Sequence, residues 1–283
     1  MIRMILALAL CLAAPALARP AMWVVRDADT DITIYGTIHA MPAGAKWLSK
    51  GAATRLDRAD TLVLEAIVPE DPRVIAPMMQ ARGLLATPRP LKDRVPAALH
   101  AKLDAAVAKS GMPPALLERM KSWLVAITLT QQVVLDAGLD PKSGVEWQLR
   151  ERAAKKGTKL GELEGVAAQF ALFDGLSTAD QDALLAEAVS DAGAMQAQID
   201  GIWKAWSAGN VDRIAAEFSD ADASPAMKKA LLTDRNAHWA AWVQARLAKP
   251  GRVMVAVGAG HLGGPDSLIA MLRARGLKVR RVE

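Results

Sequence analysis

The feature that most constrains the fold is an unbroken apolar run near the C-terminus, Val253–Val257, which leads directly into Gly258-Ala259-Gly260-His261. Five apolar residues without polar alternation are typical of a strand buried on both faces, as in a parallel sheet covered by helices. The glycines allow a sharp turn after the strand because they lack a Cβ atom. Functional side chains of open α/β sheets gather at the carboxyl ends of the strands. His261 is therefore a candidate site residue.

A second segment of the same kind lies near the N-terminus. A strand expected at 31–35 is followed by Gly36-Thr37-Ile38-His39, so both ends of the chain contain a strand and then Gly-x-x-His. The alternative is that each histidine is bonded by backbone groups in the core or at a cap. Because the two copies use two of the four histidines in the chain, a shared site is the better interpretation.

Two acidic residues, Glu65 and Glu164, stand at the ends of strands expected at 61–64 and 159–163. An acid directly after an apolar strand can be a helix cap or a surface residue. If these strands run parallel to the two histidine strands, however, their carboxyl ends share one edge. Because adjacent strands lie about 4.8 Å apart, the acids and the histidines are expected to face one crevice.

The rest of the chain reads as alternating strands and helices, which predicts an α/β fold with a mixed, partly parallel sheet flanked by helices. Further strands are expected at 22–26 and 277–282, and helices at 49–58, 97–110, 113–137, 145–155, 166–176, 179–208, 225–247 and from about Pro265. Glu146 lies in the first turn of one of these helices, where a carboxylate stabilises the helix dipole. We expect one domain, 19–283, with helical insertions at about 69–143 and 177–248.

The first 18 residues have the pattern of a signal peptide. Arg3 precedes an apolar stretch at 5–14, and Ala16-Leu17-Ala18 is a small-x-small cleavage site. A buried helix or a membrane anchor would be the alternatives, but the apolar stretch is shorter than the ~20 residues that span a bilayer. The pattern predicts export, cleavage near Ala18, a periplasmic or secreted protein, and no stable membrane span.

Composition excludes several kinds of chemistry. The only cysteine, Cys11, lies in the expected signal peptide, so the mature chain has no thiolate catalysis, thiolate metal ligands or disulfides. Any metal site must use histidine, carboxylate and water. The net charge of +5 is carried by basic residues without interleaved aromatic residues, which argues against a nucleic-acid partner.

Together these motifs resemble the TraB/GumN family, which includes the TIKI metalloproteases of animals. The resemblance covers nearly all of the mature chain and rests on the following segments: Tyr35–His39, the strand ending at Glu65, Gly144-Val145-Glu146, Leu163-Glu164 followed by Gln169, Leu232–Asn236 and Val257–Leu262. It implies that two Gly-x-x-His motifs and an acid gather in one cleft. His39, Glu65 and His261 match the metal-binding positions, and Glu164 and Arg235 match further polar positions. One departure is Gly165, where the family often has a hydroxyl residue.

The chemistry that the resemblance implies is metal-dependent hydrolysis of a peptide or other small substrate. Two imidazoles and a carboxylate would leave a metal position open for water, and ligands of this kind suit Zn, Mn or Co. Glu164 is then expected to act as general base or to orient a ligand histidine, and Arg235 to bind a substrate carboxylate or an oxyanion. Gly36, Asn236, Gly258 and Gly260 are expected to contact substrate. The hypothesis is an exported metal-dependent hydrolase, such as a metalloprotease.

Two other functions compete with this hypothesis. Gly258, Gly260 and Gly263 spell G-x-G-x-x-G, but a dinucleotide site needs a βαβ unit and an acid about 20 residues further on. Only 20 residues follow Gly263, so we reject a dinucleotide cofactor. A non-catalytic periplasmic binding or assembly protein linked to cell-surface polysaccharide stays open as the alternative function.

Overall fold

A six-stranded sheet forms the centre of the protein. The computed structural model describes residues 18–42, 44–190, 192–219 and 224–283. The strand order is β6-β4-β7-β2-β1-β8, with β1 Met22–Arg26, β2 Thr30–Thr37, β4 Thr61–Leu64, β6 Lys159–Glu162, β7 Gly251–Gly258 and β8 Val279–Arg281. Strands β6, β4, β7 and β2 run parallel to one another, and β1 runs antiparallel to both β2 and β8. The predicted α/β class with a mixed, partly parallel sheet is confirmed.

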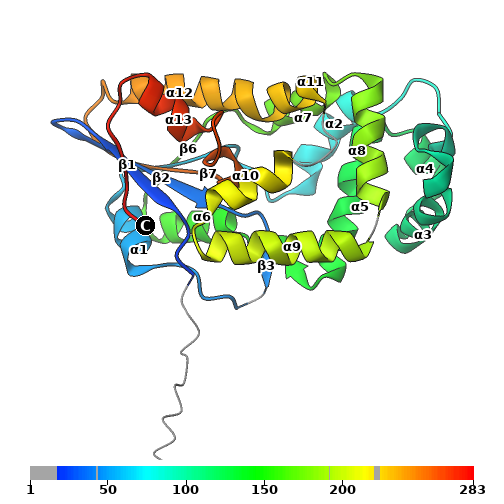
Figure 1. Cartoon of the computed structure of the whole chain (residues 1–283), viewed down its shortest axis with the longest axis horizontal. Coiled ribbons are helices and arrows are strands. Elements are labelled where there is room, and N and C mark those ends of the chain that lie inside the picture. The colour runs from blue at the N-terminus through cyan, green and yellow to red at the C-terminus, as the bar shows by residue number, and fades with distance from the viewer. Residues whose placement is uncertain (1–17, 43, 191, 220–223) are drawn as a thin grey trace, which may run out of the picture.

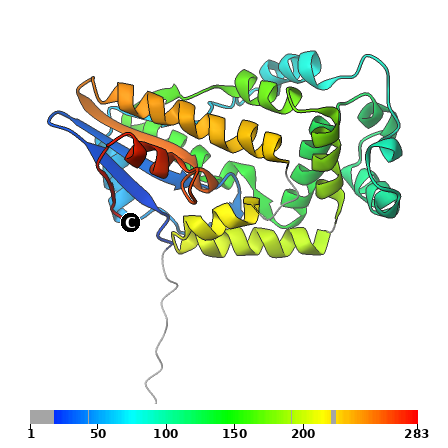
Figure 2. The same cartoon turned by 45° about the horizontal axis from the view of Figure 1, so that its top comes forward.

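The apolar run that predicted a doubly buried strand is β7, which lies between β2 and β4. Its residues 253–257 are all buried, because helices cover both faces of the sheet. Helices α1 (Lys50–Arg58) and α6 (Val145–Lys156) lie against one face. Helices α12 (Asp234–Arg246) and α13 (Leu268–Ala274) lie on the other (Figures 1 and 2).

The remaining helices extend the molecule away from the sheet (Figure 1). They are α2 Pro72–Gly83, α3 His100–Ser110, α4 Pro114–Glu118, α5 Ser122–Asp136, α7 Val166–Asp174, α8 Thr178–Ser190, α9 Ala192–Ser207, α10 Val211–Ser219 and α11 Pro225–Lys228, with short helical turns at Leu91–Arg94, Ala97–Leu99, Pro141–Ser143, Lys229–Thr233 and Ala259–His261. Two short strands, β3 Met41–Pro42 and β5 Leu139–Asp140, form a separate antiparallel pair. Helices α3, α4, α5 and α8 share a second hydrophobic core, distinct from that of the sheet.

Three helix boundaries differ from the sequence prediction. The helix expected over 113–137 is broken between α4 and α5, because Met120 pairs with Leu84 in an isolated β-bridge and its carbonyl accepts a hydrogen bond from the buried Arg94 guanidinium. The helix expected over 179–208 is two helices, α8 and α9, which run in different directions (Figure 1). The last helix begins at Leu268 rather than near Pro265, since the Ser267 hydroxyl caps it by accepting from the N–H of Ala270.

The N-terminal segment 1–17, which contains most of the predicted signal peptide, lies outside the described residues. Within the described part of the chain, none of the helices is both long enough and apolar enough to cross a bilayer.

Candidate functional site

The candidate site lies at the carboxyl ends of three adjacent parallel strands. Glu65 follows β4 directly, and Gly258 is the last residue of the neighbouring β7. The backbone N–H of Gly258 donates to Glu65 Oε1 at 2.6 Å. A Cβ atom at Gly258 would lie 3.2 Å from that oxygen, so glycine allows the carboxylate to approach the strand end. Glu65 is only 8% exposed.

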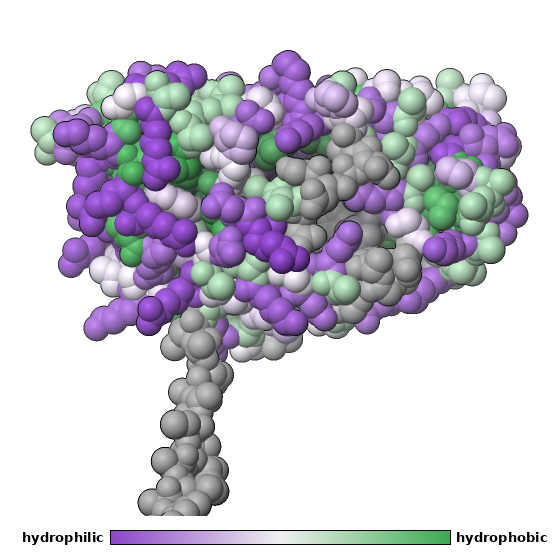
Figure 3. Space-filling view, in the orientation of Figure 1, coloured by the Kyte–Doolittle hydropathy of each residue, from purple (hydrophilic) through white to green (hydrophobic). Residues whose placement is uncertain are grey.

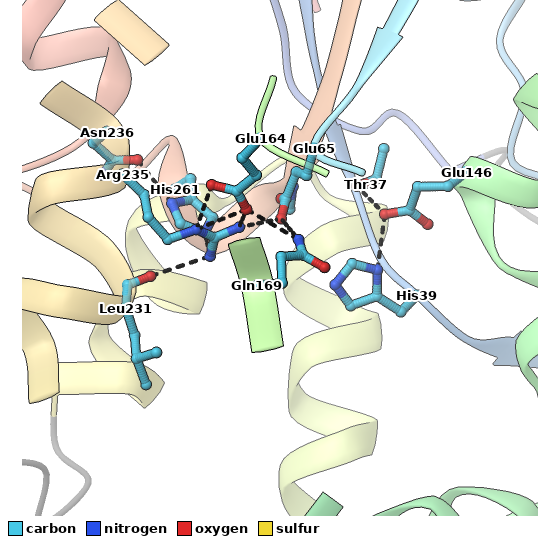
Figure 4. A network of polar contacts seen from close by, with 11 residues as sticks. Thr37, His39, Glu65, Glu146, Glu164, Gln169, Leu231, Arg235, Asn236 and His261 are labelled. Atoms are coloured by element: carbon cyan, nitrogen blue, oxygen red, sulfur yellow. Dashed lines mark hydrogen bonds and ion pairs between the residues drawn. The ribbon is translucent and has the colours of Figure 1, made fainter. Parts of the chain in front are cut away.

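Arg235 of α12 holds Glu65 and Glu164 together (Figure 4). Its Nη2 atom donates to Glu65 Oε2 at 2.6 Å and to Glu164 Oε1 at 2.5 Å, and its Nε donates to Glu164 Oε1 at 3.1 Å. Gln169 adds a donor to both acids, at 3.4 Å from Glu65 Oε2 and 3.0 Å from Glu164 Oε1. The side chains of Arg235 and both acids are 10–13% exposed, so these charges are largely removed from water.

The electrostatic balance keeps Glu65 ionised. Burial raises the pKa of this carboxyl, but the neighbouring cationic groups and the Gly258 N–H outweigh burial, and the pKa stays below its ordinary value. Arg235 is the partner that matters at neutral pH, because burial lowers the pKa of His261 to about 4 and leaves that imidazole uncharged.

A π-helical turn at Lys229–Thr233 precedes α12 and widens the helix just before Arg235. Such turns often occur at functional sites because they change the direction of the following side chains. Arg235 Nη1 donates back to the carbonyl of Leu231 at 3.1 Å. The next residue, Asn236, is fully buried. The polar run 233–236 therefore places two successive residues of α12 inside the protein.

Asn236 determines which nitrogen of His261 carries the proton. The Nδ2 group of Asn236 donates to the carbonyl of Asp266 at 2.8 Å, so Oδ1 is the atom that faces His261 Nδ1 at 2.7 Å. An amide oxygen only accepts, and Nδ1 must therefore donate. The lone pair of the neutral imidazole is then on Nε2, which accepts from Arg235 Nη1 at 3.0 Å.

His39 forms a second, separate group at the end of β2. Its Nδ1 atom lies 2.9 Å from Glu146 Oε1, which also accepts from the Thr37 hydroxyl at 2.5 Å. The Glu146 carboxylate raises the pKa of His39 to about 9; solvent screens this attraction, because the imidazole is 77% exposed. His39 Nε2 makes no hydrogen bond or ion pair within the described residues, and no dashed line joins it to a neighbour in Figure 4.

The structure brings together most of the predicted residues, but not as one set of metal ligands. Glu65, Glu164, Arg235, Asn236 and His261 form one connected cluster, which we call the Arg235 cluster. The hydrogen bonds and ion pairs of His39 join it instead to the group of Glu146 (Figure 4). In the described residues, no three His, Cys, Asp or Glu side chains are arranged so that they could hold a metal ion.

The predicted substrate-binding glycines have different positions. Gly36 lies inside β2, where its N–H donates to the Ala21 carbonyl and its own carbonyl accepts from Trp206 Nε1 at 3.0 Å. A Cβ atom there would lie 3.2 Å from a side-chain carbon of Leu262, so glycine serves close packing. Gly258 contacts Glu65, as described above, and Gly260 is buried in the turn that ends at His261.

Sequence reasoning missed three residues of the site: Thr37, Glu146 and Gln169. Glu146 had been interpreted as a helix-terminal charge, and it does lie in the first turn of α6. Its carboxylate nevertheless crosses to β2 and binds Thr37 and His39. The sequence did contain a signal for two of these residues, because Glu146 and Gln169 both lie in segments that carry the family resemblance.

Comparisons with known proteins identify the family of this chain. A model of the TraB/PrgY/gumN family matches residues 21–281. The chain belongs to this family. It is 26% identical over 259 residues to the uncharacterized protein YbaP of Escherichia coli (strain K12), covering 90% of this chain and 92% of that protein, and it has the same identity and coverage with YbaP of Shigella flexneri. No solved structure matches the chain.

The structure explains why position 165 is a glycine rather than a hydroxyl residue. This residue has φ +83° and precedes α7, a backbone conformation that side-chain-bearing residues rarely adopt. Its N–H donates to the Glu65 carbonyl at 3.3 Å. Glycine here makes a tight turn that carries Glu164 towards Arg235.

Proposed function

We propose that this TraB/PrgY/gumN protein is a divalent-metal-dependent hydrolase, of the metallopeptidase kind. The observation that carries the proposal is the way both Gly-x-x-His histidines are oriented. In each, Nδ1 is held by an oxygen, Glu146 Oε1 for His39 and Asn236 Oδ1 for His261. Metal-binding histidines have this arrangement, because the bond to one ring nitrogen fixes the ring and leaves the other nitrogen for the metal.

The chemistry of the donor set suits a hard or borderline divalent ion. The three side chains are not arranged to hold one in the described structure, so binding would require them to move. His39 Nε2, His261 Nε2 and the Glu65 carboxylate would hold it, with Zn, Mn or Co as candidates. Two adjustments would accompany binding. Arg235 would withdraw from His261 Nε2, where its guanidinium now supplies the positive charge. His39, whose pKa Glu146 raises, would release a proton as it binds.

The residues around such an ion have defined roles. The ion would supply a Lewis acid that polarises a carbonyl and lowers the pKa of water. Glu164 lies in contact with Arg235 and Gln169, outside the three ligands, and would accept a proton from the attacking water. The donor that Arg235 would withdraw from His261 would then be available to bind a substrate carboxylate or a developing oxyanion.

The test is metal binding by three single variants of chelator-treated protein. His39→Ala and His261→Ala should each weaken Zn, Mn or Co binding in calorimetry by at least tenfold and abolish metal-stimulated cleavage of a peptide library. The matched control is His100→Ala, since His100 lies on α3 and its side chain bonds the Lys92 carbonyl. Wild-type protein that binds none of the three ions would overturn the proposal.

Export is part of the same proposal. The charged and apolar pattern of residues 1–18 supports cleavage near Ala18 and a periplasmic or secreted location. N-terminal sequencing of the protein from the exported fraction should begin at Arg19. Recovery of the chain with Met1 in the cytosolic fraction would contradict it.

A non-catalytic binding or assembly role is favoured by one observation. The guanidinium of Arg235 is fully engaged by protein groups in the Arg235 cluster, as in a structural ion pair. Under this alternative, His261→Ala would lower the melting temperature of the metal-free protein and no metal would bind to the wild type.

A further inference from the structure

A cavity of about 500 Å³ lies at the opposite end of the central strands from the candidate functional site. It is lined by the last residue of β1, by residues in the first half of β2 and of β7, and by one side of α1. Strand β2 runs from Thr30 near this cavity to Thr37 at the candidate site. At about 3.3 Å per residue the two ends are about 23 Å apart, so the cavity is a separate feature.

The pairing of three strands concentrates charge at this edge of the sheet. Arg26 of β1 pairs with Asp31 of β2, and Asp31 pairs with Arg252 of β7. Paired residues point to the same face of a sheet, and all three line the cavity. Arg26 Nη2 bonds Asp31 Oδ2 at 2.6 Å. Arg252 Nη2 instead lies 3.4 Å from Oδ1 of Asp60, a residue that does not line the cavity.

Helix α1 adds three more basic residues. Arg55 is the most buried of them: its side chain is 23% exposed, and its Nη1 donates to the Thr33 hydroxyl at 3.2 Å and lies 3.6 Å from Asp31 Oδ1. Lys50 and Arg58 are exposed at the cavity wall. Neither side chain makes an ion pair or a hydrogen bond within the described residues.

Positive charge in the cavity is not balanced by the protein. The lining contains five basic residues and one acid. At its margin, Asp60 pairs with Arg252, Glu283 bonds Ser49, and Arg280 is a further base. In the lining and its margin together, basic groups therefore outnumber acidic groups two to one. Burial lowers the pKa of Arg55, and repulsion from Arg26 and Arg280 lowers it further despite Asp31. A bound anion would relieve this repulsion.

The helix α1 and the β1–β2 hairpin lie at the left end of the molecule in Figure 1. The space-filling view in Figure 3 shows hydrophilic residues along much of the outer edge of this end. The cavity is larger than an inorganic phosphate, and its walls include the aliphatic stems of long basic side chains. Its volume is in the range of small-molecule sites. Arginine forks bind phosphate oxygens in pairs.

From these observations, we propose that this cavity binds the phosphate or diphosphate group of a larger organic ligand, with Lys50, Arg55 and Arg58 as the principal contacts. Arg55 is oriented in advance by Asp31 and Thr33. Lys50 and Arg58 have no competing acid and supply the unpaired charge. The proposal does not depend on the metal site.

The experiment titrates chelator-treated protein with inorganic pyrophosphate, which removes any contribution from a bound metal. The test variant is Lys50→Gln/Arg58→Gln. The control is Arg119→Gln/Lys159→Gln, which makes the same charge change at exposed residues that do not line the cavity. Calorimetry should show at least tenfold weaker binding by the test variant and wild-type binding by the control. Circular dichroism checks that both variants are folded.

A second arm distinguishes the source of the phosphate group. Flotation with phosphatidylglycerol vesicles, compared with phosphatidylcholine vesicles, tests whether a lipid headgroup occupies the cavity. Vesicle binding that is lost in the test variant and kept in the control supports the proposal with a headgroup as ligand. The proposal is overturned if wild-type protein binds neither pyrophosphate nor anionic vesicles, or if both double variants lose binding equally.

Discussion

The Nη1 atom of Arg235 lies 3.0 Å from Nε2 of His261, and this contact connects α12 to the turn after β7. Because Asn236 holds the proton on Nδ1, the arginine donates to the lone pair that a metal ion would use. The Trp239 ring lies beside both groups, 4.5 Å from the His261 ring and 4.7 Å from the Arg235 guanidinium carbon. Arg235 would thus compete with a metal ion for His261 Nε2.

Replacing Arg235 should therefore affect stability and metal binding in opposite directions. Arg235→Gln would leave Glu65 and Glu164 buried without their cation. Removing one partner of a buried ion pair costs about 3–5 kcal/mol. The same change frees His261 Nε2, so Zn, Mn or Co should bind more tightly and restore part of the lost melting temperature. Thermal unfolding with and without each ion measures both effects.

The control for this prediction is Arg73→Gln, which removes an equally charged residue from an exposed pair with Asp71. It should leave both stability and metal binding unchanged. If added metal restored no stability to Arg235→Gln, competition between Arg235 and a metal would be excluded.

Asn236→Leu should destabilise the fold through unsatisfied polar groups. The variant keeps a similar volume but leaves the buried His261 Nδ1–H without a partner, and the carbonyl of the exposed Asp266 loses its amide donor. A buried group left unpaired costs about 1–3 kcal/mol. Because water can replace the lost donor to Asp266, we expect a loss of roughly 1–3 kcal/mol in urea unfolding. Gln132→Leu, which removes an exposed bond to Asp136, should change the free energy of unfolding little. Equal effects of the two variants would contradict the role given to Asn236.

Glu146→Leu should loosen His39 without altering the Arg235 cluster. The leucine cannot accept the bonds from His39 Nδ1 and the Thr37 hydroxyl. Metal affinity should fall by roughly 10–100-fold, the usual effect of removing a residue that orients a ligand histidine, while Glu146→Gln, which keeps an accepting oxygen, should lose less. Calorimetric titration compares the three proteins. Unchanged affinity in Glu146→Leu would show that Glu146 does not position His39.

The ion pair between Asp57 of α1 and Arg152 of α6 should make a pH-dependent contribution to stability. The hydrogen bond from Arg152 lowers the pKa of Asp57 in the folded protein. Stabilisation is therefore present above the unfolded pKa of about 3.9 and is lost as pH falls through the lower folded pKa. Because both side chains are about one-third exposed, the contribution is at most about 1 kcal/mol.

Urea unfolding of the wild type and Asp57→Asn across pH 2–7 measures this contribution. The difference between them should be present at pH 7 and disappear at the acid end. A difference that stays constant with pH would mean that the asparagine acts through packing and not through the lost charge.

The sequence alone determined which residues stand at the strand ends. The apolar runs before Glu65 and Gly258 are long enough and hydrophobic enough that only buried strands accommodate them, and the α/β class follows. Because parallel strands align their carboxyl ends, the sequence also predicts that His39, Glu65 and His261 share one edge. Glu65 and His261 are joined through Arg235, whereas the contacts of His39 join it to Glu146. These inferences depend on local pattern and on the fixed geometry of strands.

Only the tertiary structure decided which side chains are partners. Arg235 reaches both acids because a π-helical turn sets the direction of α12, and Glu146 reaches His39 because α6 packs beside the end of β2. These contacts join residues about 70 to 170 positions apart in the chain. The local sequence pattern does not predict contacts between residues so far apart in the chain. The free energy that brings these residues together comes from the packing of whole helices on the sheet.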